Sequence, residues 1–598
     1  EWNLLLSRSV DKDYLKGVSS HSDYQYDELG YPTHMKLAYG KSNKIVERKL
    51  RHRIGFSYHL GILEEQTEIT QKESGQSSIT SLYTYNSDFQ PIEIDKYLNG
   101  NPQLTIQRTQ STYDRWGNVT SECTLYYDSP KGSTKSYIYD ETGHHLLSTR
   151  DALGLETRYA DHEKHGRARR ITDPLGQMTR VEYDAFGLIA QETTPDGTVT
   201  STTHEQHPDG TYTIVKRRTG TPTSYRVCDA LDRELRTGTE QHDGSILWEA
   251  KMYDGAGRVV RSSLPYRDGT QPLWIEHEYD MFGRQIAQRE PSGVATTWAY
   301  ELIQQQGKRG ECNQITETKG GISIKRTYGE LGELLSSEDL GGKIIYSYRP
   351  DGQVDRITAP GDVVTSFEYD TYGRQTALND PSSGRREITY AYAQDGTHTE
   401  RKSSPNGGVT TVTDPYGRLV RIERDKDFST SYTYDNYSRL TEEQSTNGSF
   451  KGYTYDALGR TASLVEGVSP SKTLRRTYYY GSGGELARLT YHTPNEEEFT
   501  ELYIYEHGHH VMTLLQSPLR PQQDTIWHLL SVNNMGVPIR ARTGGQERTY
   551  SYDPVGLLTG RSMGAVQEER YTFDPQTGNL LERQWRVEDS VRRQTFSY

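Results

Sequence analysis

The sequence has few cysteines, and this excludes one common way of stabilising a long chain. Cys123, Cys228 and Cys312 form an odd, widely spaced set among 598 residues. A disulfide framework needs cysteines that are numerous and even in number. The fold must therefore depend on some other interaction that the sequence repeats.

Apolar residues are also scarce. They make up 32% of the chain, and the mean hydropathy is -0.86. Counted with Gly and without Tyr, the apolar share is roughly 34%, against the usual 45–50%. Disorder does not explain this shortage, because the chain has 45 Tyr and aromatic residues make up 10% of it. A thin sheet, polar on both faces and filled by Tyr, reconciles the two observations.

Positive charge is not in excess, and long apolar runs are missing. The net charge is -13, which argues against nucleic acid as the main partner. The basic stretches 48–53 and 164–170 are interpreted as solvated strand and turn faces. No run of 18 apolar residues occurs, so we expect no membrane span.

One short pattern, Y-D-x-x-G, recurs along the whole chain. Asp can open a type I turn and accept a hydrogen bond from the backbone N–H two residues on, and Gly can close the turn with a positive φ. Tyr suits the end of a half-buried strand. The pattern therefore predicts strand, tight turn, strand. Its copies start at Tyr26, Tyr113, Tyr139, Tyr183, Tyr253, Tyr279, Tyr369, Tyr455 and Tyr552.

Substitutions within the pattern follow turn chemistry. Proline stands directly after Asp173, Asp414 and Asp553, where its fixed φ suits the second position of a type I turn. Asp232 and Ser438 replace the closing glycine in two units. We expect both to adopt positive φ, Asp232 more comfortably than Ser438.

Spacing between the units predicts one continuous repeat array. Tyr434 and Tyr455 are 21 residues apart, and Tyr455 and Tyr480 are 25 apart, which is room for two strands and two turns. About 25 such units give on the order of 50 strands. So long a sheet must coil, since open sheets rarely exceed about ten strands. We predict an all-β fold: a long antiparallel sheet of hairpins that spirals into a hollow cocoon or barrel.

We predict a single shell over residues 1–598. Residues 1–110 would hold degenerate repeats with longer strands, 111–505 regular repeats, and 506–598 the last repeats before a truncation. Residues 301–325 interrupt the pattern and are expected to form a loop or insertion.

The units resemble the RHS/YD repeats of bacterial polymorphic toxins. The form Y-D-x-x-G-R, present at 279–284, 369–374 and 455–460, carries the resemblance, which covers nearly the whole chain. It implies a hollow β-shell that encloses a C-terminal toxic domain, as in insecticidal toxin complexes and type VI secretion effectors. Teneurins carry a similar barrel, but the disulfide-rich domains that accompany it in teneurins are absent here, which favours the bacterial branch.

The resemblance implies a non-enzymatic shell that sequesters a toxic effector and helps to deliver it. The expected partner is a toxin domain, from the chain's own C-terminal region or from a separate chain. Secretion-apparatus, chaperone or cap proteins are further candidates. Secretion or display on a bacterial surface is implied. An adhesin that binds glycans or a neighbouring cell through its Tyr-rich surface remains the alternative.

No residues are assigned to catalysis, to a cofactor or to a metal. Asp553–Gly560 resembles the D-P-x-G-L-x-G-G stretch with which self-cleaving relatives end, but Thr559 stands in place of a glycine and repeats continue beyond it. His204 and His207, three apart in a strand, point to opposite faces. Residues 506–510 (Glu-His-Gly-His-His) could bind a metal if one more ligand converged on them, but a solvated turn is the favoured interpretation.

Overall fold

The computed structural model describes most of the chain. The described residues are 7–13, 18–39, 42–54, 59–72, 74–127, 129–304, 311–329, 331–425, 427–469, 471–495, 497–518, 520–564, 567–587 and 590–597. They form 51 strands and no helix, so the predicted all-β fold with on the order of 50 strands is confirmed. Among these residues there is no helix that could cross a membrane.

The strands follow one another along a continuous antiparallel sheet, which we divide into two coils. The first coil comprises β1 (Arg8–Asp13), β2 (Val18–Tyr26), β3 (Pro32–Tyr39), β4 (Ser42–Ile54), β5 (His59–Lys72), β6 (Gly75–Tyr85), β7 (Pro91–Leu98), β8 (Thr105–Tyr113), β9 (Val119–Tyr126), β10 (Ser133–Tyr139), β11 (Leu146–Arg150), β12 (Glu156–His162), β13 (Ala168–Thr172), β14 (Met178–Tyr183), β15 (Ile189–Thr193), β16 (Val199–Gln206), β17 (Tyr212–Arg218), β18 (Ser224–Cys228), β19 (Glu234–Glu240), β20 (Ile246–Tyr253), β21 (Val259–Ser263), β22 (Tyr266–Arg267), β23 (Trp274–Tyr279), β24 (Gln285–Arg289) and β25 (Ala295–Gln304).

The second coil continues without a break in the sheet. It comprises β26 (Glu311–Lys319), β27 (Ile322–Tyr328), β28 (Leu334–Asp339), β29 (Gly342–Tyr348), β30 (Val354–Ala359), β31 (Val363–Tyr369), β32 (Gln375–Asp380), β33 (Gly384–Tyr392), β34 (His398–Ser404), β35 (Gly407–Thr413), β36 (Leu419–Arg424), β37 (Ser429–Tyr434), β38 (Leu440–Ser445), β39 (Phe450–Tyr455), β40 (Thr461–Ser469), β41 (Lys472–Tyr480), β42 (Leu486–His492), β43 (Glu498–Glu506), β44 (His509–Ser517), β45 (Arg520–Val532), β46 (Pro538–Thr543), β47 (Gln546–Tyr552), β48 (Leu558–Met563), β49 (Gln567–Phe573), β50 (Leu580–Val587) and β51 (Ser590–Thr595).

Each strand pairs with its neighbours in sequence, and the one departure lies at β20. There β20 pairs with both β21 and β22, and β21 pairs with β23. The register shifts by one residue just before the tyrosine of the repeat, as at Thr454/Tyr455. This bulge accompanies the glycine-closed turn that follows, and it fixes the register of each hairpin.

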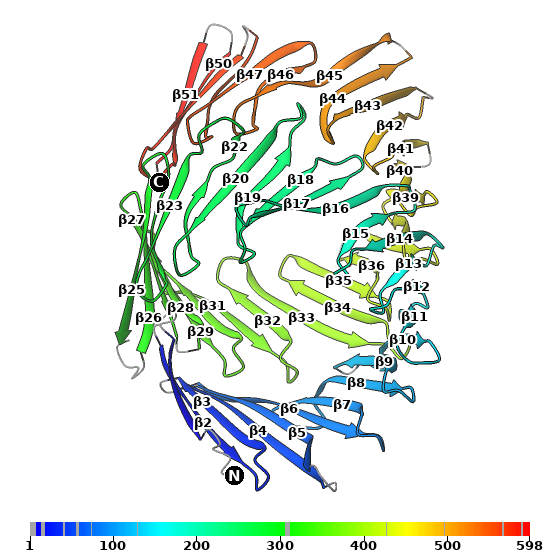
Figure 1. Cartoon of the computed structure of the whole chain (residues 1–598), viewed down its shortest axis with the longest axis vertical. Helices are drawn as coiled ribbons and strands as arrows, with labels where there is room; N and C mark the ends of the chain where they lie inside the picture. Colours follow the sequence, from blue (N-terminus) through cyan, green and yellow to red (C-terminus); the bar gives the residue numbers. More distant parts are fainter. Residues whose placement is uncertain are drawn as a thin grey trace.

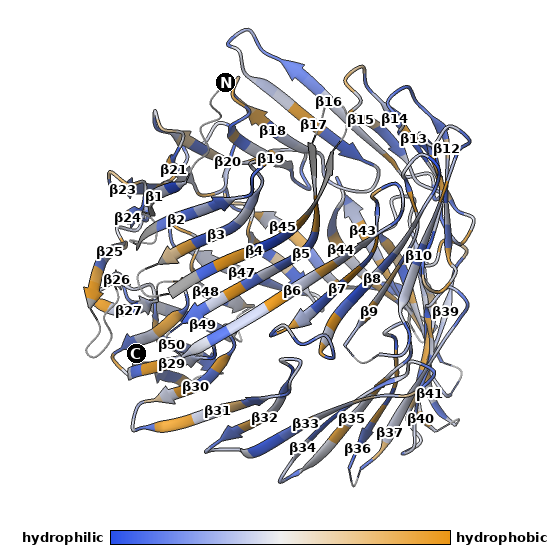
Figure 2. Ribbon diagram, turned by 90° about the horizontal axis from the view of Figure 1, so that it is seen from below, coloured by the Kyte–Doolittle hydropathy of each residue, from blue (hydrophilic) through white to orange (hydrophobic). Residues whose placement is uncertain are grey.

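The sheet is thin, and little of it is buried. The chain exposes 35366 Å², whereas a compact protein of 68.2 kDa is expected to expose about 21,000 Å². Among the described residues only 14 hydrophobic and 17 polar or charged side chains are buried. Figure 2 shows hydrophilic and hydrophobic residues interspersed along the strands. A solid core of the size usual for such a chain is therefore excluded.

The sheet winds into a coil of about two turns. In Figure 1 it runs from β2 through β10–β15, crosses back to β23–β27, and repeats this course through β28–β41 to β51. β2 contacts β26, so one turn takes about 24 strands, or about 115 Å of sheet and about 37 Å of diameter at 4.8 Å per strand.

The described residues of 301–325 do not form the expected loop. β25 extends to Gln304, and β26 begins at Glu311 and ends in a tight hairpin at Gly320 and Gly321. Both glycines have positive φ, 57° and 82°, as the two central residues of a type I′ turn require. The glycine pair therefore continues the array. Part of the predicted loop, 305–310, lies outside the described residues.

Candidate functional site

The repeated turn is a compact set of hydrogen bonds around one carboxylate. In the unit that starts at Tyr455, Gly459 N–H donates to the carbonyl of Asp456 over 3.0 Å. Oδ1 of Asp456 accepts from the N–H groups of Leu458 and Arg460, both at 2.9 Å. Gly459 has φ 81°. The predicted turn is confirmed, with one bond more than the sequence indicated.

The two substituted glycine positions behave as predicted. Asp232 has φ 60° and Ser438 has φ 65°. Each still closes its turn through a backbone bond of 3.0 Å, to Asp229 and Asp435 respectively. The turn therefore forms without glycine where the residue at its fourth position adopts a positive φ.

The tyrosine of the repeat is a hydrogen-bond donor as well as a filler between strands. Tyr455 Oη–H donates to the carbonyl of Leu440, the first residue of the preceding strand, over 2.6 Å. That strand end would otherwise have one carbonyl without a partner from the ladder. The hydroxyl explains why the repeat uses Tyr rather than Phe. The same bond is made by Tyr183, Tyr253, Tyr279, Tyr300, Tyr348, Tyr369, Tyr390, Tyr434, Tyr480, Tyr505 and Tyr552.

The arginine after the glycine joins one unit to the next. Arg460 Nε donates to Oδ2 of Asp456 over 2.8 Å, and its guanidinium lies 4.4 Å from the ring centroid of Tyr480 in the next unit. An ion pair of this kind on an aromatic face is a charge-assisted bond and a cation–π contact at once. We call the pair formed by the Asp Oδ2 and the next aromatic ring the guanidinium cradle.

These groups are held in single protonation states near neutral pH. Partial burial, the largest influence, favours the neutral acid at Asp456, but the hydrogen bonds from Arg460 and Leu458 outweigh it and lower the pKa of Asp456. Burial raises the pKa of the Tyr455 and Tyr480 hydroxyls. The repeat is thus built for fixed contacts.

Hairpin turns line two rims of the sheet, and the two coils meet rim to rim. The Y-D rim carries the turns that begin at Asp114, Asp229, Asp370 and Asp456, and the opposite rim carries the turns between them. Gln177, on the opposite rim of the first coil, donates to the carbonyl of Ala457 on the Y-D rim of the second, over 2.9 Å. We call this line of contact the seam.

The seam is held by polar contacts and by close backbone approach. Thr198, whose side chain is fully buried, donates to the carbonyl of Ser482 over 3.0 Å. A Cβ at Gly508 would lie 2.5–2.6 Å from backbone atoms of Thr221 and Pro222. Glycine is therefore required there by the neighbouring coil as well as by its φ of 77°.

Histidines from the 506–510 stretch belong to this seam. His507 Nδ1 lies 2.8 Å from Oε1 of Glu240, and His509 Nε2 lies 2.7 Å from the Glu240 carbonyl. The interpretation of this stretch as a solvated turn misses this contact, because no pattern in one sequence links residues about 270 apart. Hydrogen bonds from Thr223, the larger influence, and from His507 lower the pKa of Glu240.

The other candidates from the sequence are not brought together. His207 contacts Thr213 at 2.7 Å, and His204 stays exposed. Within the described ranges no three His, Cys, Asp or Glu side chains form a group that could hold a metal. Asp553 sits in an ordinary turn, its Oδ1 accepting from Val555 and Leu557 at 3.0 and 2.8 Å.

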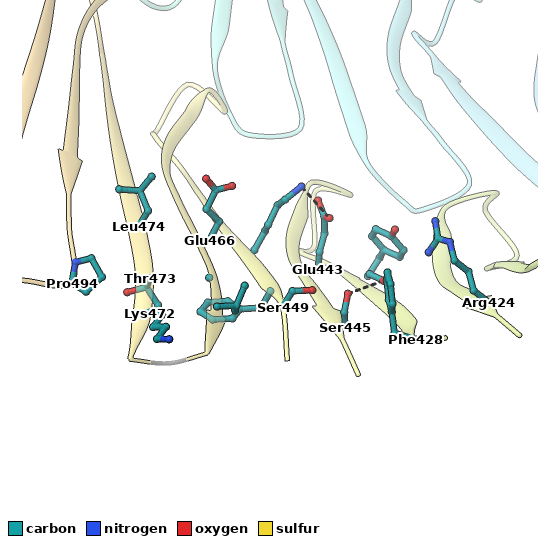
Figure 3. A pocket seen from close by; sticks show the side chains of 16 residues that line it. Arg424, Phe428, Glu443, Ser445, Ser449, Glu466, Lys472, Thr473, Leu474 and Pro494 are labelled. Atoms are coloured by element: carbon teal, nitrogen blue, oxygen red, sulfur yellow. Dashed lines mark hydrogen bonds and ion pairs between the residues drawn. The ribbon is translucent and has the colours of Figure 1, made fainter. Parts of the chain in front are cut away.

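A groove of about 650 Å³ lies at the opposite rim of the second coil. Figure 3 shows Phe428, Glu443 and Glu466 along it, with Leu474 and Pro494 beyond. Glu443 accepts from the Tyr453 hydroxyl over 2.6 Å, and Glu466 is paired with Arg476. The groove therefore combines aromatic rings with carboxylates that already have partners.

Two family profiles match this chain. That of the Teneurin YD-shell family matches residues 269–500, and that of the RHS Repeat matches residues 162–199. Both lie in the part of the chain where the repeated turns are regular.

Two relatives are bacterial proteins of much greater length. The Double-stranded DNA deaminase toxin A of Burkholderia cenocepacia (strain H111) is 29% identical over 170 residues, which are 28% of this chain and 10% of that protein. The tRNA3(Ser)-specific nuclease WapA of Bacillus spizizenii is 23% identical over 339 residues, 52% of this chain and 14% of that protein. Among solved structures, TcdB2-TccC3-TEV aligns with 99% of this chain, and the alignment covers 50% of the TcdB2-TccC3-TEV chain. The sequence identity is 10% and the TM-score is 0.37.

Proposed function

We propose that this chain, an RHS/YD-repeat protein, is the wall of a shell that sequesters a toxic polypeptide and helps to deliver it from a bacterium. The wall itself carries out no chemistry. The guest is a toxin domain, supplied by the same polypeptide or by a second one. Secretion or display at the cell surface goes with this role.

The observation that carries the proposal is a coiled sheet one layer thick. Its exposed area of 35366 Å² is about two thirds more than a compact protein of this mass would have. The extra area is the surface of a wall with two solvated faces. The seam joins successive coils through contacts such as those of Gln177 with Ala457 and of Thr198 with Ser482, so the wall continues from one coil to the next.

The relatives support the toxic nature of the guest. One is named as a deaminase toxin and one as a nuclease, and this chain matches only 10% and 14% of their lengths. We therefore propose that this chain, like these relatives, is associated with a toxin. Any catalytic activity belongs to the guest.

Protease protection tests the proposal. We would fuse a small cytotoxic domain after Tyr598 and follow its cleavage by a broad-specificity protease beside the same domain alone. We expect the fused domain to be cleaved at least tenfold more slowly. Equal cleavage rates for the fused and the isolated domain would contradict the proposal.

The groove at the opposite rim favours a second function, glycan binding. Phe428, Tyr432 and Phe450 line it together with Ser445, Ser449 and Thr430. Aromatic rings beside hydroxyl groups suit the faces and edges of sugars. A glycan array with a dose-dependent signal that is lost in Tyr432→Ala would support an adhesin, and a flat array would exclude it.

A further inference from the structure

The seam opens near its C-terminal end into a cavity of about 780 Å³. On one side it is lined by the opposite rim of the first coil, including Leu264, Ile275 and Val294. On the other side stand Asp553 and Phe573, from the last units of the Y-D rim. The cavity therefore lies between two coils that are in contact elsewhere along the seam.

Seven units of this chain show what an Asp and the next aromatic ring hold between them. In each, the arginine four residues after Asp pairs with Oδ2, and its guanidinium carbon lies 4.4–5.1 Å from the centroid of the next tyrosine ring. The arginines are Arg233, Arg258, Arg284, Arg374, Arg418, Arg439 and Arg460.

At the cavity the cradle is present and its arginine is missing. Leu557 stands four residues after Asp553, at the position where the seven units have arginine. Phe573 is the last residue of β49, at the position where those units have the stacked Tyr. Oδ1 of Asp553 makes the usual two turn bonds. No side chain among the described residues donates to its Oδ2.

Two other units without arginine have filled the same position. Asn118 donates to Oδ2 of Asp114 over 3.0 Å, and Thr142 donates to Oδ2 of Asp140 over 2.8 Å. Asp184, with Leu188 at the arginine position, makes only its two turn bonds, but β16, the next strand that ends on this rim, ends at Gln206 and offers no ring. Asp553 thus differs in having an aromatic ring, Phe573, at the end of the corresponding strand.

Charge around the cavity suits a cation. Asp553, Asp574 and Glu290 contribute carboxylates, and the one cation in the lining, Lys319, is 3.2 Å from Oε1 of Glu290. The remaining wall is largely apolar. A cavity of this volume is of the size that binds a ligand larger than one side chain.

We propose that this cavity binds an arginine side chain of an extended polypeptide segment. The guanidinium lies on Oδ2 of Asp553 and on the ring of Phe573, as the chain's own arginines lie on theirs. Apolar neighbours of that arginine contact Leu264, Ile275 and Val294. The inference stands apart from the shell function, since it follows from the cradle alone.

Peptide binding measured by calorimetry tests this. The probe is acetyl-Leu-Arg-Leu-amide, and the control replaces Arg by citrulline, which keeps the shape and loses the charge. We expect the arginine peptide to bind at least tenfold more tightly. Acetyl-arginine-amide should bind at least tenfold more weakly than the peptide. Equal binding of that small molecule would overturn the assignment to a polypeptide.

Two variants of the cavity and one matched control sharpen the test. Asp553→Asn keeps the turn, because Asn533 already makes the same two bonds, at 2.9 and 3.1 Å, and it should weaken binding at least tenfold. Leu557→Arg restores the repeat pattern, so its own guanidinium should occupy the cradle and abolish binding. Asp414→Asn changes a cradle that Arg418 fills, and should bind as the parent does.

The outcomes separate cleanly. The proposal fails if the parent does not bind the arginine peptide, if the citrulline peptide binds as well, or if Leu557→Arg retains affinity. It also fails if Asp414→Asn and Asp553→Asn weaken binding alike. A shell that protects its guest without binding the peptide would refute this inference and leave the proposed function intact.

Discussion

The Y-D rim has the same local structure in both coils but a different environment in each. In the first coil the third residue of the turn is exposed: Phe186 by 87%, Leu231 by 74% and Trp116 by 57%. In the second coil the corresponding residues are less exposed than these three, Tyr416 by 43% and Tyr437 by 41%, while Tyr372 and Leu458 are half-buried. The opposite rim of the first coil packs on this rim. One motif thus serves as a free edge and as half of a joint, and the neighbouring coil decides which.

The largest expected effect comes from glycines that differ only in this environment. Gly508 and Gly257 have φ 77° and 80°, but a Cβ would meet the backbone of the other coil at Gly508 and nothing within 4 Å at Gly257. Gly508→Ala should cost more than about 3 kcal/mol and Gly257→Ala about 1 kcal/mol, the cost of positive φ alone. Urea unfolding measures both. Equal losses would mean that the seam is not closed at Gly508.

The next largest effect is expected from two turns whose aspartates accept different numbers of hydrogen bonds. Asp456→Ala removes two turn bonds and the bond from Arg460 at the seam, whereas Asp184→Ala removes only two turn bonds, from Phe186 and Leu188. We expect losses of about 3 and about 1.5 kcal/mol in the free energy of unfolding. Hydrogen exchange of the seam peptides should rise in the first variant alone. A rise in both would contradict the comparison.

Tyrosine hydroxyls should not distinguish the coils. Tyr455 donates to Leu440 and Tyr183 donates to Ala168, at 2.6 and 3.0 Å, each within its own sheet. Tyr455→Phe and Tyr183→Phe should each cost about 1 kcal/mol, measured by urea unfolding. A loss confined to the second coil would show that the hydroxyl acts through the seam.

The smallest effect is pH dependence at Glu240. Its pKa is lowered by hydrogen bonds from Thr223 and His507, so its contribution is complete above the ordinary Glu value of about 4.3 and is lost as pH falls through the lowered pKa. Hydrogen exchange near His507 should therefore rise below about pH 4. Glu240→Gln should flatten this rise. An unchanged profile in the variant would assign the pH dependence to other groups.

The sequence predicted the fold and the turn, and missed the joint. Asp and Gly at fixed spacing fix a hairpin locally, which is why the conformations at Asp232 and Ser438 could be stated in advance. The arginine after the glycine was a readable signal, since Y-D-x-x-G-R recurs. The Tyr–carbonyl bond and the pairing of Gln177 with Ala457 were not readable, because the first needs the bulge geometry and the second joins residues 280 apart.

Because each strand pairs almost entirely with its chain neighbours, the sheet can form without contacts between residues that are far apart in the sequence. Each hairpin can add to the growing edge as soon as it leaves the ribosome, as in other repeat arrays with low contact order. Contacts between coils form only after some 250 further residues have been made. The first coil can thus be complete before the second coil packs against it.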